Sequence, residues 1–219
     1  MKVLWKKIGM IFLAMNLVGL AVALFLANRL GSDSIGLLCD GIRAATGLQY
    51  GNASLAYNLL VIVLAWLTAR KNLGLGTIVY ALCSGYFIDF YSWLLAPLSL
   101  GDQALVFRVL GFIAGQTALS LALAILIQMN LGMNALDALL YCLEKISHIP
   151  YAYLRTGIDI SYVIVGTALG GTFGAGTICS VLLTGTMVSV IIKLLQKTGQ
   201  HKQEEKRRPY GIAKGVEKI

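Results

Sequence analysis

Two charged residues lie four positions apart inside an otherwise apolar stretch of this chain. Arg155 and Asp159 share one helix face at this spacing, so they can pair. Charges among apolar residues are costly unless they face a polar interior, and they often mark a path for ions or polar ligands. Asn58 and Ser54 precede Asp159 and Arg155 by the same 101 residues. We therefore treat Arg155, Asp159 and Asn58 as candidate ligand-binding residues; alternatively, the pair only fastens its helix.

A single carboxylate, Asp89, lies about twelve residues into another apolar segment. At that depth it can bind a cation or carry a proton. The alternative places Asp89 at the outer bilayer surface, beside Tyr91 and Trp93 as part of an aromatic belt. Asp89 is a candidate ligand-binding residue on the first hypothesis.

The pattern G-x-G-T-I occurs twice, at residues 74–78 and 174–178, each time before an apolar run. Glycine permits backbone conformations that other residues resist, and a threonine hydroxyl can cap the helix that follows. A helix N-terminus also offers unpaired N–H groups and a partial positive charge to a polar or anionic ligand. Tight turns and close helix packing explain the same glycines without a ligand. On the ligand hypothesis the contacts are Gly76, Thr77, Gly176 and Thr177.

No catalytic or metal-binding motif is legible. The sequence shows no nucleophile–base pair, P-loop or zincin pattern, and two histidines, His148 and His201, are too few for a His-rich metal site. The four cysteines lie in apolar stretches without C-x-x-C spacing, which is typical of packing residues. We therefore expect no enzyme activity, no cofactor and no bound metal.

The composition indicates a lipid environment. Of the 219 residues, 58% are hydrophobic and 13% charged, whereas soluble domains average about 25% charged residues. The net charge of +8 is concentrated at the two ends of the chain. A basic tail beside a membrane indicates that the tail stays on the cytoplasmic side. The tail lacks the aromatic residues and the fold of a nucleic-acid binder. We predict an all-α polytopic membrane protein whose partner is the lipid bilayer, with no nucleic acid.

Six segments approach the ~20 residues that a helix needs to cross a bilayer. Two shorter, charged segments, residues 33–47 and 134–147, are typical of interfacial or re-entrant helices. Asp137 suits the N-terminus of the second one, where it complements the helix dipole. Asn16, Gln116 and Thr117 are predicted to form hydrogen bonds between helices. The predicted spans are residues 8–27, 52–69, 75–96, 105–128, 151–169 and 177–195.

The chain contains an internal repeat. Residues 74–88 and 174–188 agree at six of fifteen positions, including three glycines and a threonine, and Leu30-Gly31 matches Leu131-Gly132. We divide the chain into a first membrane repeat (1–101), a second membrane repeat (102–195) and a basic cytoplasmic tail (196–219).

Topology follows from the number of spans in each half. Three spans per half is an odd number, so the halves form an inverted 3+3 repeat, as in many secondary transporters. This arrangement puts Arg70, Lys71 and Lys145 in the cytoplasm with both termini, in agreement with the positive-inside rule. If the short helices also cross, the alternative is an eight-span parallel repeat.

Several stretches resemble the YczE/YyaS/YitT family of bacterial integral membrane proteins: LGSDSIGLL, GIRAATGLQYGNASLAYNLL, the GLGT turn and GYFID. The resemblance covers roughly residues 8–195, leaving the tail outside. Tyr86 and Thr186 stand where the family usually has proline. The resemblance implies a small multi-pass protein of the bacterial inner (cytoplasmic) membrane, and a candidate transporter without an assigned substrate.

These features favour a small-molecule transporter or permease with a central cavity between two inverted repeats, for an unknown small polar or charged ligand. A substrate-binding membrane subunit of a larger energised transporter suits the small size of the chain. A third hypothesis is a non-transporting membrane partner or chaperone of a cytoplasmic enzyme, acting through the basic tail. A homo-oligomer or a partner subunit is compatible with each of them.

Overall fold

The computed structural model describes residues 2–69, 75–129 and 135–207, whose regular elements are all helical. The α-helices of these residues are α1 (Lys2–Asn28), α2 (Ser34–Thr46), α3 (Tyr50–Ala69), α4 (Leu75–Leu95), α5 (Leu105–Met129), α6 (Ala135–Ser147), α7 (Tyr151–Ala168) and α8 (Ala175–Arg207). Two short 3₁₀ helices, η2 (Ala96–Leu98) and η3 (Leu100–Asp102), connect α4 to α5.

Within the described residues, five helices are long and apolar enough to cross a bilayer: α1, α3, α4, α5 and α8. They correspond to five of the six predicted spans. The sixth, 151–169, forms helix α7, but its sequence YAYLRTGIDISYVIVGTA contains two charges and several hydroxyl groups. Because these polar groups lower its hydropathy, α7 does not meet the same requirement, and its crossing stays a prediction.

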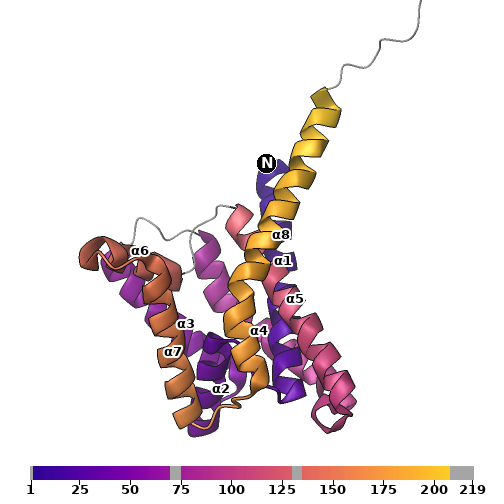
Figure 1. Cartoon of the computed structure of the whole chain (residues 1–219), viewed down its shortest axis with the longest axis vertical. Coiled ribbons are helices and arrows are strands. Elements are labelled where there is room, and N and C mark those ends of the chain that lie inside the picture. The colour runs from indigo at the N-terminus through magenta and orange to yellow at the C-terminus, as the bar shows by residue number, and fades with distance from the viewer. Residues whose placement is uncertain (1, 70–74, 130–134, 208–219) are drawn as a thin grey trace, which may run out of the picture.

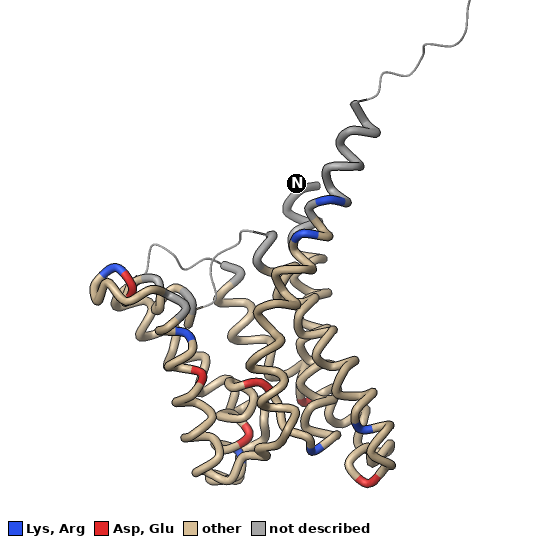
Figure 2. Tube along the Cα trace, in the orientation of Figure 1, with Lys and Arg blue, Asp and Glu red and all other residues tan. Residues whose placement is uncertain are grey.

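The outer faces of the long helices are strongly apolar. Trp66 on α3, Trp93 on α4 and Leu182 on α8 expose 57%, 73% and 70% of their surface. Figure 2 shows long uncharged stretches in the middle of α1, α5 and α8. Apolar patches of this extent are rare on water-soluble monomers, and here they suit contact with lipid tails.

The path of the chain places the two short helices at opposite ends of the bundle (Figure 1). Helix α1 runs from the end that holds the N-terminus to the other end, where α2 lies. Helix α6 lies near the N-terminal end, and α8 returns to that same end. With 13 residues each, α2 and α6 are about 20 Å long, which is too short to cross ~30 Å of hydrocarbon. The prediction of two short helices is confirmed.

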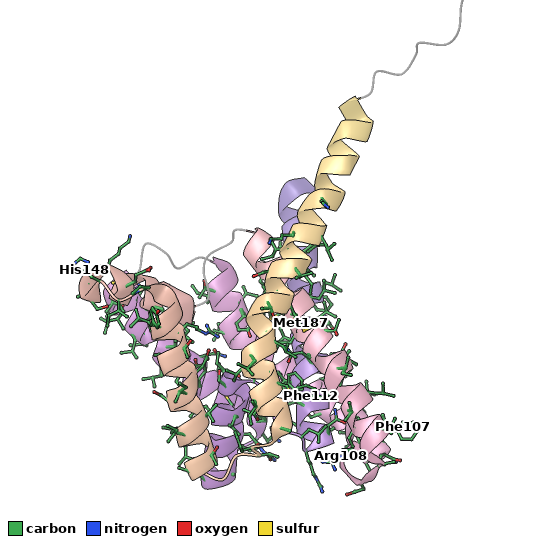
Figure 3. All side chains as sticks on the ribbon, in the orientation of Figure 1. Phe107, Arg108, Phe112, His148 and Met187 are labelled. Carbon is green, nitrogen blue, oxygen red and sulfur yellow. The ribbon has the colours of Figure 1, made fainter. Side chains whose placement is uncertain are left out.

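Each short helix packs on a long helix from the other half of the chain. Helix α2 packs on α7, and α6 packs on α3. The remaining large contacts join α1 to α4 and α5, α3 to α4, and α5 to α8. Figure 3 shows Phe112 of α5, which stacks on Phe25 of α1 with ring centroids 5.2 Å apart.

Polar side chains connect several of these helices. Asn16 of α1 accepts a hydrogen bond from the Tyr91 hydroxyl of α4 at 3.0 Å. Gln116 of α5 bonds Ser180 and Thr184 of α8, both at 2.8 Å. These two predictions of interhelical bonds are confirmed. The prediction for Thr117 is wrong, because its hydroxyl donates to the Ile113 carbonyl of its own helix at 2.8 Å.

The crossing of α2 over α7 depends on glycine. A Cβ atom on Gly41 would collide with the carbonyl oxygen of Gly166, and one on Gly166 would lie 2.7 Å from the Leu37 carbonyl oxygen. Small residues at this crossing let the two backbones approach closely, as in many helix pairs inside membranes. The contact is therefore specified by two positions about 125 residues apart.

We expect Gly166→Ala to destabilise the protein by about 1–3 kcal/mol, because the added methyl group overpacks the crossing. The matched control is Gly157→Ala on the same helix, where nothing lies within 4 Å of the added Cβ. Thermal melting of the purified proteins in detergent checks this expectation. Gly157→Ala is expected to melt at or above the wild-type temperature, since alanine favours helix. Equal melting of the two variants would contradict the crossing.

Candidate functional site

Arg155 and Asp159 form an ion pair on α7, as their spacing predicted. The Nε of Arg155 lies 3.1 Å from Oδ2 of Asp159, and their side chains are 32% and 14% exposed. The hydroxyl of Ser34, the first residue of α2, donates to Oδ1 of Asp159 at 2.5 Å. The pair therefore lies where the N-terminus of α2 meets α7, and both halves of the chain contribute to it.

Asp33 belongs to the same place, although we did not select it from the sequence. It precedes Ser34 at the N-cap position of α2, where its carboxylate faces the N–H of Gly36. Its Oδ1 is inaccessible to solvent and has no hydrogen-bond partner within the described ranges. Burial raises the pKa of Asp33, and nearby Asp159 raises it further, whereas Gly36 and Arg155 oppose the shift. The available signal was an acidic residue directly before a short helix.

Asn58, which we expected to resemble Asp159, forms its hydrogen bonds away from the Arg155–Asp159 pair. Its side-chain amide donates to the Ala81 carbonyl of α4 and to the Ser54 hydroxyl, both at 3.4 Å. These bonds stabilise the packing of α3 on α4. The link between α3 and α7 comes instead from Tyr57 and Tyr162, whose hydroxyls lie 3.2 Å apart.

Asp89 accepts a hydrogen bond from the N-terminal turn of a neighbouring helix. Its Oδ1 accepts the N–H of Gly51, in the first turn of α3, at 2.9 Å. A Cβ atom on Gly51 would collide with this carboxylate, and one on Gly85 would lie 2.5 Å from the Gly51 carbonyl oxygen. The close approach of α3 and α4 thus places a carboxylate at the positive end of a helix, where it is favoured.

Asp89 also lines an open cavity of about 690 Å³ between the last turns of α1 and α4, the α2–α3 connection and the two 3₁₀ helices. One part of the wall is apolar, with Ala23, Leu26 and Leu95. Polar groups line the rest: Arg29, Arg43, Tyr50, Asp89, Ser92 and Asp102. The Ser92 hydroxyl is buried and has no hydrogen-bond partner among the described residues. Both signs of charge and an apolar wall therefore meet in one space.

Two arginines of this cavity are held by carboxylates. Arg43 Nη2 lies 2.8 Å from Oδ1 of Asp40, a residue whose side chain is 3% exposed. The other Asp40 oxygen accepts the N–H of Thr172 at 2.8 Å. Arg29 lies 3.5 Å from Asp102 in an exposed pair. Asp40 thus fixes the orientation of Arg43 and connects α2 to the α7–α8 loop.

The threonine of the second G-x-G-T turn does not cap its helix. Helices α4 and α8 begin at Leu75 and Ala175, so Thr77 and Thr177 lie within the first turn instead of at the N-cap. Thr177 is fully buried, and its hydroxyl has no hydrogen-bond partner in the described part of the chain. For Thr177 the capping prediction is wrong, because α8 starts two residues earlier than it requires. Gly74 lies outside the described residues.

At the start of α8 a backbone carbonyl accepts one of the N–H groups that we proposed for a ligand. The N–H of Gly176 donates to the Leu30 carbonyl at 2.8 Å. Gly31 has φ +98°, and a Cβ atom there would collide with the Thr177 hydroxyl. The α1–α2 loop therefore packs directly on this turn. Gly76 and Thr77 lie at the equivalent position on α4, and Thr77 is buried.

The predicted residues therefore fall in separate places. Arg155 and Asp159 meet Asp33 and Ser34 at the α2–α7 crossing, and Asp89 lies in the cavity. Asn58 joins α3 to α4, and Gly176 with Thr177 supports the α1–α2 loop.

Residues 5–193 match the model of a family of unknown function, DUF6198. The chain belongs to the DUF6198 family. A Haemophilus influenzae protein is 25% identical over 193 residues, covering 88% of this chain and 86% of the relative. Bacillus subtilis YyaS is 23% identical, covering 96% of this chain and all of YyaS. B. subtilis YczE, described as an uncharacterized membrane protein, is 23% identical over 65% of this chain and 64% of its own length. No solved structure matches.

These matches confirm the resemblance to the YczE/YyaS group that the sequence suggested. Together with the apolar helices they identify this DUF6198 chain as a membrane protein.

In this DUF6198 protein, we expect Asp159→Ala to cost on the order of 2 kcal/mol, between the ~1 of exposed ion pairs and the ~3–5 of buried ones. The change leaves the guanidinium of Arg155 without this carboxylate in a low-dielectric setting. The double variant Arg155→Ala/Asp159→Ala should melt at a higher temperature than Asp159→Ala alone. A control cycle on Arg29 and Asp102, which are 67% and 71% exposed, should show no measurable coupling. Equal coupling in both cycles would show that the α7 pair behaves as a solvated surface pair.

Proposed function

We propose that this protein transports a small zwitterionic solute across the bacterial cytoplasmic membrane, without enzymatic activity. The observation that carries the proposal is the open cavity of about 690 Å³ with charged and apolar walls. Its volume lies within the range of about 300–1,000 Å³ that is usual for small-molecule sites.

The chemistry of the lining selects the class of solute. Arg29 and Arg43 supply positive charge, Asp89 and Asp102 supply negative charge, and Ser92 offers a hydroxyl. A solute that carries both charges can satisfy both groups, and an apolar body would contact Leu26 and Leu95. A purely cationic or anionic solute would match only one of these two sets of charges.

The proposed architecture is six spans in two inverted repeats, with α7 as the sixth span. It is supported by the exchange of short helices between the halves, α2 onto α7 and α6 onto α3. The start of α1 and the end of α8 lie at the same end of the bundle (Figure 1), as an even number of spans requires. Lys193 and Lys197 lie near that end of α8, so the positive-inside rule favours a cytoplasmic location for it. The cavity then opens on the outer side.

Site-directed labelling tests this topology. In a variant whose four native cysteines are replaced by serine, Gln103→Cys should react in whole cells with a membrane-impermeant maleimide. Gln200→Cys should react only after the membrane is permeabilised. Labelling of both positions from outside, or the reverse pattern, would overturn the proposed orientation.

The solute class is tested by thermal stabilisation. The probes are the twenty standard amino acids and glycine betaine, with choline and citrate as singly signed controls. At least one zwitterion should raise the melting temperature of the purified wild type, while choline and citrate should not. Ser92→Trp fills the cavity and should abolish the shift. Leu94→Trp, on the same helix but half exposed outside the lining, should retain it. A shift that persists in Ser92→Trp, or no shift with any zwitterion, would refute the assignment.

Transport itself is tested with the zwitterion that gives the largest shift. Proteoliposomes of the purified protein should accumulate it in radiolabelled form, and those containing Ser92→Trp should not. Binding without uptake would instead favour the substrate-binding subunit of a larger transporter. Absence of both, with function lost on truncation of the tail, would favour a membrane partner of a cytoplasmic enzyme.

A further inference from the structure

The two crossings of a short helix over a long helix differ in the charge of the residues at equivalent positions. At the α2–α7 crossing, the hydrogen bond from Ser34 to Asp159 fixes which residues meet. The two halves of the chain are offset by 101 residues here, so each of these residues has a counterpart on α3 or at the start of α6. All of the counterparts are uncharged: Asn134 for Asp33, Ala135 for Ser34, Ser54 for Arg155 and Asn58 for Asp159.

The three charges of the α2–α7 crossing therefore have no charged counterparts at the equivalent positions of the α6–α3 crossing. Helix α6 carries its own charges, Asp137, Glu144 and Lys145, at other positions. Asn134 itself lies outside the described residues. Ionisable groups at membrane depth are costly and commonly mark ion or proton pathways.

We propose that Asp33, held beside Asp159 and Arg155, binds a proton whose uptake and release are coupled to solute movement. This inference rests on the proposed function and names the ion that energises it.

Counting the charges identifies the proton as the ligand. Asp159 pairs with the guanidinium of Arg155, and Asp33 interacts electrostatically with both. When both carboxylates are ionised this partly buried group carries one net negative charge, and one proton neutralises it. Net neutrality is strongly favoured where water is scarce.

Hydrogen bonding decides which carboxylate takes the proton. Asp159 accepts hydrogen bonds from the Ser34 hydroxyl and from Arg155, so both of its carboxylate oxygens have a partner. The Oδ1 of Asp33 has no hydrogen-bond partner among the described residues and is shielded from solvent. Asp33 is therefore the carboxylate that protonates.

The other groups near Asp33 do not compete for this proton. The Cys39 thiol and the tyrosine hydroxyls are neutral near pH 7, since their ordinary pKa values are about 8.5 and 10. Asp40 is paired with Arg43. Among the described residues, Arg155 and Asp159 on α7, Cys39 on α2 and Tyr50 on α3 interact electrostatically with Asp33. Asp40, Tyr57 and Tyr162 interact with these neighbours.

Helix α2 connects the proton site to the cavity. Its first turn holds Asp33 and Ser34 against α7, and its last turn carries Arg43, which lines the cavity. Tyr50, another cavity residue, donates to the Gly36 carbonyl in the first turn of α2 at 3.4 Å. A change of charge at Asp33 therefore acts on a rigid helix of 13 residues whose other end contacts the solute space.

Infrared difference spectroscopy of the purified protein, recorded between neutral and alkaline pH, tests the proton site without any solute. The wild type should show the carbonyl stretch of a protonated carboxyl group at neutral pH, lost as pH rises. Asp33→Asn should abolish this band, and Asp102→Asn, which changes an exposed carboxylate, should retain it. No band in the wild type, or an unchanged band in Asp33→Asn, would overturn the proposal.

Asparagine is a good N-cap residue and stands at the equivalent position 134, so Asp33→Asn is expected to fold. Should it not fold, Arg155→Gln supplies a second measurement. Removing the guanidinium eliminates an interaction that favours ionised Asp33, so the band should persist to higher pH than in the wild type. A band that titrates at the wild-type pH in Arg155→Gln would count against the cluster.

The pH dependence of thermal stability gives an independent test, because the raised pKa of Asp33 determines the direction of the change. The pKa of Asp33 is raised above its ordinary value of 3.8, so the folded state binds a proton more tightly than the unfolded state does. This contribution to stability is present at low pH and is lost as pH rises through the folded-state pKa. Wild-type melting should therefore fall over that range, and Asp33→Asn should show a smaller fall. Parallel pH profiles would contradict the assignment.

Proteoliposomes separate this inference from the proposed function. Uptake of the stabilising zwitterion should accelerate when the solute-containing side is made acidic, and Asp33→Asn should remove the acceleration. An infrared band lost in Asp33→Asn, without uptake of any zwitterion, would retain the proton site and refute the transporter. Uptake that follows a sodium gradient and ignores pH, with no infrared band, would retain the transporter and refute proton coupling.

Discussion

The rest of the structure depends on the docking of the α1–α2 loop and helix α2 onto the α7–α8 region. In a lipid environment, backbone groups that leave a helix have no water to bond, so the protein must supply partners. Here Leu30 accepts the N–H of Gly176, and Asp40 accepts the N–H of Thr172. The Gly41–Gly166 contact brings the two backbones close enough for this. One irregular segment of each half thus finds a hydrogen-bond partner in the other half.

The same constraint explains two further charges, which are partly buried. Asp89 accepts an N–H at the start of α3, and Arg108 donates to the Asn28 carbonyl at the end of α1 at 2.9 Å (Figure 3). In these cases a charged side chain completes a helix terminus from a neighbouring helix, where the helix dipole favours its sign. The cluster of Asp33, Asp159 and Arg155 differs, because two of its three charges bind each other and one carboxylate oxygen has no hydrogen-bond partner among the described residues.

The sequence predicted features that depend on local pattern. Apolar length identified the long helices, charge identified the two short ones, and the spacing of Arg155 and Asp159 predicted their pairing. Hydrogen-bond partners that are distant in sequence could not be predicted, because no local pattern brings Ser34 to Asp159 or Leu30 to Gly176. Symmetry also misled: Asn58 occupies the position equivalent to Asp159 but bonds α4, since an amide can satisfy a carbonyl that a carboxylate cannot. Asp33 escaped selection because its charged neighbours, Arg155 and Asp159, lie on α7, which is distant in sequence.

The two halves share a sequence pattern but pack differently. Helix α3 approaches α4 so closely that Gly51 and Gly85 have no room for a Cβ atom. Gly185 stands at the position of Gly85 in the second half, yet nothing lies within 4 Å of its Cβ position. The α3–α4 contact closes one side of the cavity, since Tyr50 and Asp89 come from these helices. The close approach at Gly85, which Gly185 lacks, therefore belongs to the helix pair that borders the cavity.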